Sequence, residues 1–501
     1  MRRSTARVRR TRRGAVLAVA LVAVLSSACG SRLTGGALRV AEGATNGNGS
    51  AGAGALGAST DASGTGATAT AGASGTAGTS GTAGTSGTAR ATASAGGSKG
   101  ATAPGGGAGA GATSAACNAS NNGGATDAGI TANTITIGNI TSISGVAPGL
   151  TQSAQAATEA FAAYVNSSGG ICGRQLKVIT YDDQNDASQN AADAAQACKA
   201  TFALVGSASG FDNGGASTVQ GCGIPYVGAE LSTHEMGDVP NAFGASPGNA
   251  HYWATGPAVW LKSQYPNAVT HAAMIYLNVP ATQEQAASEM KAYQSVGFNY
   301  IYTVAVSPTE PNYAPYVAKM QSAGVQYVTE YSDDNSAARL LQAMAQANYQ
   351  PQVVDWFSEE YGQHFLSEAQ GDANGDLVLM ATTPYEDPPN PGMALFESWL
   401  NRVAPGTKHD IFAEFAWSAG LAFLQAAKAA GTHLTRATLI QQLQQIGSWN
   451  GDGVQPPDTS FGQKIPSKCF AYDKIQGNGF ARLYPSQPNT FDCTSGSLYQ
   501  Y

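Results

Sequence analysis

Hydrophobic and polar positions alternate with two different periods along the last three quarters of the chain. Residues 134–140, with the sequence TITIGNI, alternate in steps of two, which predicts a β-strand. Residues 151–166 place Ala154, Ala157, Phe161 and Val165 on one face of a helix, and Gly169-Gly170 predicts where it ends. The same pattern predicts a strand at 176–181, a helix at 186–200, and short apolar strands at 202–205 and 224–227.

The alternation restarts after residue 250. It predicts helices at 251–263, 281–296, 312–323 and 335–347, and strands at 271–277, 299–305, 325–330 and 352–355. Strands separated by helices of 10–15 residues predict right-handed crossovers and parallel sheets. Two such series predict an α/β fold of two doubly wound lobes, in which ligands bind at the carboxyl ends of the strands.

Each lobe is expected to take two separate pieces of the chain. We expect residues 117–250 with 377–450 to form lobe I, and residues 251–376 with 451–501 to form lobe II. Residues 450–501 are rich in proline and glycine with short strands, which is typical of a closing segment rather than a domain. The 385 residues from Cys117 onward are ample for a large core.

The N-terminus has the pattern of an export signal. Seven arginines precede an apolar run from Gly14 to Leu25, which is too short to span a bilayer comfortably. We therefore interpret residues 1–28 as a signal peptide. Ser26-Ser27-Ala28 before Cys29 resembles a bacterial lipobox, which predicts lipidation of Cys29; ordinary cleavage after Ala28 is the alternative. The apolar stretch 412–430 is interrupted by polar and charged residues, so we expect no transmembrane helix later in the chain.

Residues 29–116 are expected to form a disordered tether. This segment is dominated by Gly, Ala, Ser and Thr and contains the repeat GTAGTS at 75–86. Such a composition cannot bury enough apolar surface to offset the entropy of ordering it. About 85 flexible residues span roughly 50 Å, which would lift a domain off a membrane; compositional drift without a function is the alternative.

The cysteine count predicts disulfides. Six cysteines remain after Cys29, and an even number in an exported chain favours a disulfide framework over free thiols. Six cysteines allow fifteen connectivities. The short separations favour Cys198–Cys222 and Cys469–Cys493, and Cys117–Cys172 then follows by elimination. No CxxC pair is present, so we expect no structural metal site.

Charge and motifs exclude several classes of function. The first 28 residues carry seven basic and no acidic residues, so the remaining chain holds 19 basic against 33 acidic residues, which argues against nucleic acid as a partner. Ala208 stands at the centre of Gly206–Gly210, so the segment is not a G-x-S-x-G nucleophile elbow. There is no P-loop, and the six histidines have no metal-site spacing. We therefore expect a protein that is not an enzyme and needs no cofactor.

Four stretches in order resemble one family. They are TITIGNITSISG, GGICGRQLKVITYDDQNDASQNAADAAQ, FALVGSASG and GCGIPYVGAELST, and the likeness runs from about Ile130 to Arg482. The chain thereby resembles the type I periplasmic binding proteins, closest to the branched-chain amino acid receptors of transport systems. The resemblance implies two α/β lobes joined by three crossovers, with a ligand held in the cleft as the lobes close. It also implies that Asp182-Asp183, in the family's YDD motif, is mainly structural.

The resemblance and the needs of an amino acid together suggest a set of contacts. A ligand carboxylate needs hydroxyls and backbone N–H groups near a helix N-terminus, and an ammonium needs carbonyls and a carboxylate. The family's serine contact falls here at Gly210 or Phe211, beside Ser209, and its next contacts fall on Glu230 and Ser232. The expected ligand-binding residues are Ser209, Gly210, Phe211, Glu230, Ser232, Tyr331, Asp333 and Glu359.

Each of these residues has a simpler alternative role. Ser209 could cap a helix, Phe211 could belong to the core, and acids such as Asp333 and Glu359 at loop tips could merely be solvated.

The implied function is capture of a small solute outside the cytoplasm. The resemblance implies a monomeric lipoprotein on the outer face of the cell membrane that delivers an amino acid or related solute to the permease of an ATP-driven (ABC) importer. The alternative is a sensing or interaction module of the same fold without a dedicated permease.

Overall fold

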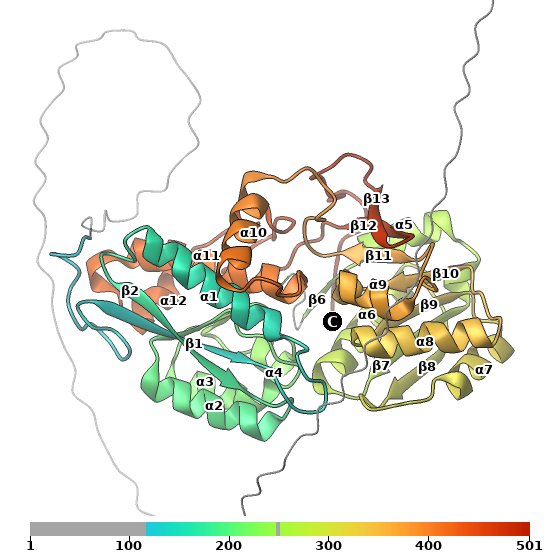
Figure 1. Cartoon of the computed structure of the whole chain (residues 1–501), viewed down its shortest axis with the longest axis horizontal. Coiled ribbons are helices and arrows are strands. Elements are labelled where there is room, and N and C mark those ends of the chain that lie inside the picture. The colour runs from blue at the N-terminus through green and yellow to red at the C-terminus, as the bar shows by residue number, and fades with distance from the viewer. Residues whose placement is uncertain (1–116, 247–250) are drawn as a thin grey trace, which may run out of the picture. The chain divides into compact units, whose positions relative to one another are not determined.

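The computed structural model describes residues 117–246 and 251–501, which fall within one compact unit of the chain (Figure 1). The signal peptide, the lipidation site Cys29 and the tether at 29–116 lie outside the described residues and stay predictions. The unit contains two large sheets, each with helices on both faces, as expected from the alternation in the sequence, and a small two-stranded sheet.

The first sheet has five parallel strands in the order β2-β1-β3-β4-β5. Its strands are β1 (Thr134–Thr141), β2 (Gln175–Asp182), β3 (Ala203–Val205), β4 (Tyr226–Gly228) and β5 (Ala242–Gly244). Because β1 lies between β2 and β3, the chain reverses its direction of winding there, and the loops after β1 and β3 diverge at the carboxyl edge.

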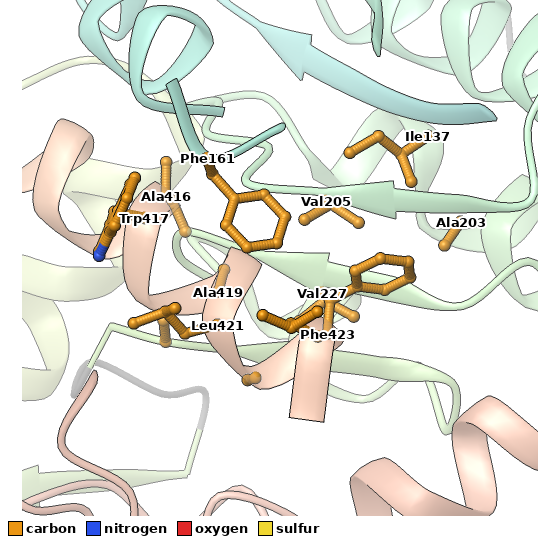
Figure 2. Close-up of a cluster of buried hydrophobic side chains, with 14 of the residues drawn as sticks. Ile137, Phe161, Ala203, Val205, Val227, Ala416, Trp417, Ala419, Leu421 and Phe423 are labelled. Carbon is orange, nitrogen blue, oxygen red and sulfur yellow. The ribbon is translucent and has the colours of Figure 1, made fainter. Parts of the chain in front are cut away.

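Helices cover both faces of this sheet and complete lobe I. They are α1 (Gln152–Ser167), α10 (Pro391–Val403), α11 (Ile411–Ala430) and α12 (Arg436–Gln444) on one face, with α2 (Ala187–Ala200), α3 (Asn213–Cys222) and α4 (His234–Gly237) on the other (Figure 1). The helix α11 is buried nearly all round, which explains its continuous apolar character. Figure 2 shows Phe161 of α1 lying between Val205 of β3 and α11, and its ring meets that of Trp417 edge-on at 6.2 Å.

The second sheet has seven strands in the order β13-β12-β11-β10-β9-β7-β8. They are β7 (Ala272–Leu277), β8 (Tyr300–Val306), β9 (Tyr327–Tyr331), β10 (Val353–Trp356), β11 (Leu377–Met380), β12 (Ala471–Gln476) and β13 (Gly479–Tyr484). The five strands from β7 to β11 are parallel and repeat the order of the first sheet, whereas β12 and β13 are antiparallel.

Lobe II is completed by helices on the two faces of this sheet. They are α5 (Gly256–Gln264) and α6 (Pro280–Ser295) on one face, and α7 (Ala314–Ala323), α8 (Asp334–Gln346) and α9 (Gln363–Ala369) on the other. Trp260 of α5 stacks on Tyr472 of β12 at 4.6 Å, so the antiparallel strands belong to the same core. Short 3-10 helices lie at Ala268–Thr270, Ser358–Glu360 (η2), Gly431–His433 and Gly451–Gly453.

Three expected boundaries are corrected by long-range strand pairing and core packing. The helix expected from 251 begins at Gly256, because β6 (Tyr252–Ala254) pairs with β14 (Leu498–Gln500). We expected the chain to return to lobe I at residue 377. Residues 377–380 instead form β11, which pairs with β10 in the second sheet, so the return comes after β11. Val454 and Phe461 pack in the core of lobe I, so the last passage into lobe II comes after them and not at residue 451.

The three expected disulfides are confirmed. Cys117 is bonded to Cys172 and so ties the first described residue to the loop after α1. Cys198–Cys222 joins the ends of α2 and α3, and Cys469–Cys493 joins the approach to β12 to the segment before β14. Within the described residues, no helix has both the length and the apolar character that crossing a bilayer requires.

Candidate functional site

The loops that follow the parallel strands of both lobes meet around a set of adjoining cavities. The first, the polar cavity, has a volume of about 350 Å³ and lies between the loop after β1 and the start of α8. It is lined by Val146, Ala147, Pro148, Gly149, Leu150, Pro308, Ser332, Asp333, Asp334, Asn335, Arg339, Glu359, His364, Lys408 and Phe412. Its size lies within the range of small-molecule sites.

A second cavity, the apolar cavity, adjoins it and shares Leu150, Glu359 and Phe412 with it. Its further walls come from Gly210 and Phe211 of lobe I and from Leu277, Val279 and Ala281 of lobe II, and Glu230 also lines it. These residues follow β1 and β3 in one lobe and β7 in the other, which are the points where the winding of the sheets reverses. The polar and apolar cavities therefore lie where doubly wound sheets bind ligands.

Glu230 supplies a carboxylate from lobe I. It follows β4, is 8% exposed, and accepts a hydrogen bond of 2.6 Å from the hydroxyl of Ser232. Burial disfavours the charged form and raises the pKa of Glu230 to about 7, although the Ser232 hydroxyl acts in the opposite direction.

Glu359 supplies a carboxylate from lobe II. It lies in η2, directly after β10, and its Oε2 atom is shielded from solvent with no hydrogen-bond partner among the described residues. Burial and the charge of Glu230 raise the pKa of Glu359 and the charge of Lys408 lowers it, so that the pKa comes to about 8. The two carboxylates, one from each lobe, are therefore close enough to influence each other.

An ion pair that the sequence did not predict joins the lobes at the polar cavity. Lys408, in the loop between α10 and α11 of lobe I, lies 2.8 Å from Asp334 Oδ2 at the start of α8 in lobe II, and 3.8 Å from Asp410. His364 Nδ1 lies 2.9 Å from the same oxygen of Asp334. Burial lowers the pKa of Lys408, but the charges of Asp410 and Asp334 outweigh it and raise that pKa overall. The only sequence signal was the charged triplet at 408–410 before an apolar helix.

Backbone contacts also join the lobes beside the cavities. The amide of Ala281 in α6 donates to the carbonyl of Gly210 at 3.3 Å. The amide of His234 in α4 donates to Glu284 Oε2 at 2.6 Å. The lobes are thus in direct contact on this side of the cleft.

Most of the residues expected from the sequence line these cavities. Gly210, Phe211, Glu230 and Glu359 line the apolar cavity, and Asp333 lines the polar one. Asp333 also caps α8, because its carboxylate accepts hydrogen bonds from the amides of residues 335 and 336. Ser232 lines a smaller third cavity, which the apolar cavity adjoins at Glu230 and Gln285.

Two of the expected residues lie behind the cavity walls. Ser209 is fully buried, and its hydroxyl donates to Asp183, which also accepts from Ser142 at 2.8 Å. Tyr331 is equally buried and donates to Glu289 at 2.7 Å. Neither is among the described residues that line the three cavities, so ligand contact by these two side chains has no support in the geometry.

Two doubly wound lobes with one cavity of ligand size between their loops, adjoined by two smaller ones, define a two-lobed solute-binding protein. The profile of the periplasmic binding protein family matches residues 134–472, and the chain belongs to that family. The family consists of binding proteins, so the chain is a binding protein rather than an enzyme. No curated protein matches the chain.

Solved structures of similar fold share little sequence with this chain. A fatty acid ABC transporter substrate-binding protein from Thermomonospora curvata has a TM-score of 0.63 at 15% identity, over 73% of this chain and 98% of that one. A leucine-binding protein from Thermotoga maritima has a TM-score of 0.59 at 12% identity, over 70% and 97%. A solute-binding protein of an ABC transporter from R. palustris, in complex with benzoate, has a TM-score of 0.59 at 15% identity, over 73% and 99%. At these identities the similarity shows the fold.

Proposed function

We propose that this protein captures a small polar solute with a cationic group, an amino acid or a related compound, and delivers it to an ABC importer. The family supports solute binding. Neighbours of similar fold include a leucine-binding protein, a solute-binding protein of an ABC transporter in complex with benzoate and a fatty acid ABC transporter substrate-binding protein, so the fold itself is compatible with several kinds of solute.

The observation that supports a cationic group in the solute is the pair of carboxylates of Glu230 and Glu359. A shielded carboxylate that has no ion-pair partner among the described residues is costly, and an ammonium that enters between Glu230 and Glu359 recovers that cost as charge-assisted hydrogen bonds. The apolar cavity wall around the pair suits the uncharged part of such a solute. The third cavity adds Glu284 to the acids that face the cleft.

Closure of the lobes follows from the same arrangement. Glu230 belongs to lobe I and Glu359 to lobe II, so a cation bound to both favours the state in which the lobes are together. The ion pair of Lys408 with Asp334 acts in the same direction.

The location of the protein is part of the proposal. Three disulfides fit an oxidising, extracytoplasmic compartment. We propose that the chain is exported, anchored through a lipid on Cys29, and held away from the membrane by residues 29–116 as a monomer.

A ligand screen tests the proposal. The full exported chain is screened by thermal shift against small metabolites, and hits are measured by calorimetry with the parent and with Glu359→Gln. Cationic hits that lose affinity in Glu359→Gln support the proposal. Glu159→Gln is the matched control, because Glu159 lies on α1 and contacts Gln155 instead of the cleft. Only neutral or anionic hits would contradict a cationic solute, and unchanged uptake of the hit in cells that lack the protein would favour a sensing role over delivery.

A further inference from the structure

We infer that the cleft selects small organic amines that carry no α-carboxylate over the corresponding amino acids. This inference rests on the proposed function, because it deepens the identity of the cationic solute. It follows from how the hydroxyls of lobe I are used and from which charges line the three cavities.

The hydroxyls that would bind a ligand carboxylate are occupied by the chain's own acids. Ser209 donates to Asp183, and Ser232 donates to Glu230 at 2.6 Å. The hydroxyl of Thr233 likewise donates to an acid, Asp212, at 2.6 Å. The loops after β3 and β4 thus turn these three hydroxyls toward carboxylates.

Two backbone amides of these loops are also occupied. The amide of Phe211 donates to Ser209 Oγ at 3.0 Å, and the amide of Ser232 donates to Asp212 Oδ2 at 2.8 Å. A ligand carboxylate would have to displace these bonds, and it would then lie next to the carboxylate of Glu230, where like charges repel.

Acids outnumber bases in the lining of the three cavities. The acids are Glu230, Glu284, Asp333, Asp334 and Glu359, and the bases are Arg339 and Lys408 with the histidines His234 and His364. Lys408 is already paired with Asp334 and lies near Asp410. The excess of negative charge favours a ligand with one or more cationic groups and disfavours a ligand whose own carboxylate cancels its charge.

The apolar cavity, which has a volume of about 40 Å³, presents apolar side chains to the remainder of an amine. Phe211 of lobe I and Val279 of lobe II line it, and Leu150 and Phe412 lie where it meets the polar cavity. An alkyl or aryl group packed on these side chains is removed from water, while its ammonium reaches Glu230 and Glu359. A second ammonium of a diamine would enter the polar cavity toward Asp333.

If the inference is wrong, Arg339 is the residue that would bind the carboxylate of an amino acid ligand. Its Nη2 donates to Ser336 at 2.8 Å, and its Nε has no hydrogen-bond partner among the described residues. It lines the polar cavity, so an amino acid could place its carboxylate there. The variant Arg339→Gln separates this arrangement from the one we infer.

Matched pairs of amines and amino acids test the inference directly. Calorimetry at pH 8 on the full exported chain compares isoamylamine with leucine, phenethylamine with phenylalanine, putrescine with ornithine, and agmatine with arginine. We expect the amine of the best-binding pair to bind at least tenfold more tightly than its amino acid. Glu230→Gln and Glu359→Gln should each weaken binding of that amine tenfold or more, and Glu159→Gln should leave it within a factor of two. Arg339→Gln, which removes a cation from the lining of the polar cavity, should not weaken it.

The outcomes distinguish this inference from the function on which it rests. An amino acid that binds as tightly as its amine, and that loses affinity in Arg339→Gln, would overturn the inference and leave a cationic solute in place. Binding of neither compound in any pair, with binding of benzoate or a fatty acid instead, would overturn both.

Discussion

Binding of a cationic solute should weaken steeply as the pH falls from 9 to 6. Burial raises the pKa of Glu230 to about 7 and that of Glu359 to about 8, so both carboxyls are largely protonated at pH 6. An ammonium binds the ionised forms, and a group with a raised pKa loses its charge as the pH falls through that value. If only Glu230 must be ionised, affinity falls by about tenfold between pH 9 and pH 6. If only Glu359 must be ionised it falls by about a hundredfold, and if both must be, by about a thousandfold.

Calorimetry of the best-binding amine at several pH values between 6 and 9 measures this loss, because alkyl amines keep their charge over that range. Repeating the titration in two buffers with different ionisation enthalpies counts the protons released on binding. We expect proton release near pH 7 that is reduced in Glu359→Gln and unchanged in Glu159→Gln. An affinity that is constant from pH 6 to pH 9, or that rises as the pH falls, would refute the assignment of these two carboxylates as the cation site.

Three further predictions concern single contacts. Glu359→Ala should weaken ligand binding about a hundredfold, roughly 3 kcal/mol. Ser232→Ala should weaken it by only roughly 1 kcal/mol, because it removes one hydroxyl bond to Glu230. Equal losses of affinity in calorimetry would contradict this ranking. Lys408→Met should weaken ligand binding about fivefold, roughly 1 kcal/mol, because it removes the ion pair to Asp334. The control Lys428→Met, on the exposed side of α11, should leave the affinity unchanged. Replacing Cys198 and Cys222 together by alanine should lower the free energy of unfolding by roughly 2–4 kcal/mol in urea titrations; free thiols at these positions in the unreduced parent would show that the bond does not form.

The periodic part of the fold was predictable from the sequence because side-chain periodicity is a local property. Strands β1, β2 and β7 and helices α1, α2 and α8 begin and end within a few residues of the expected positions. The helix expected from 251 was wrong in its first turn, because the partner of β6 lies at Leu498–Gln500, almost 250 residues away. Pairing at that separation leaves no local pattern.

In the candidate site, only the residues that lie just after strand ends were predictable from the sequence. Glu230 and Glu359 come directly after β4 and near the end of β10, and the parallel arrangement alone brings such positions to the cleft. The bond from Ser209 to Asp183 and the ion pair of Lys408 with Asp334 join residues 26 and 74 positions apart. The first depends on how the loops of lobe I pack and the second on how the lobes meet, neither of which a sequence pattern specifies, and both change which donors remain for a ligand.

A crystal structure of the protein with the best-binding amine bound tests the central proposal most directly. We predict that the ammonium nitrogen lies within roughly 3 Å of both Glu230 and Glu359, with its apolar part against Phe211 and both lobes in contact with it. A ligand bound outside these cavities, or one that places a carboxylate or a neutral group between the two glutamates, would contradict the account.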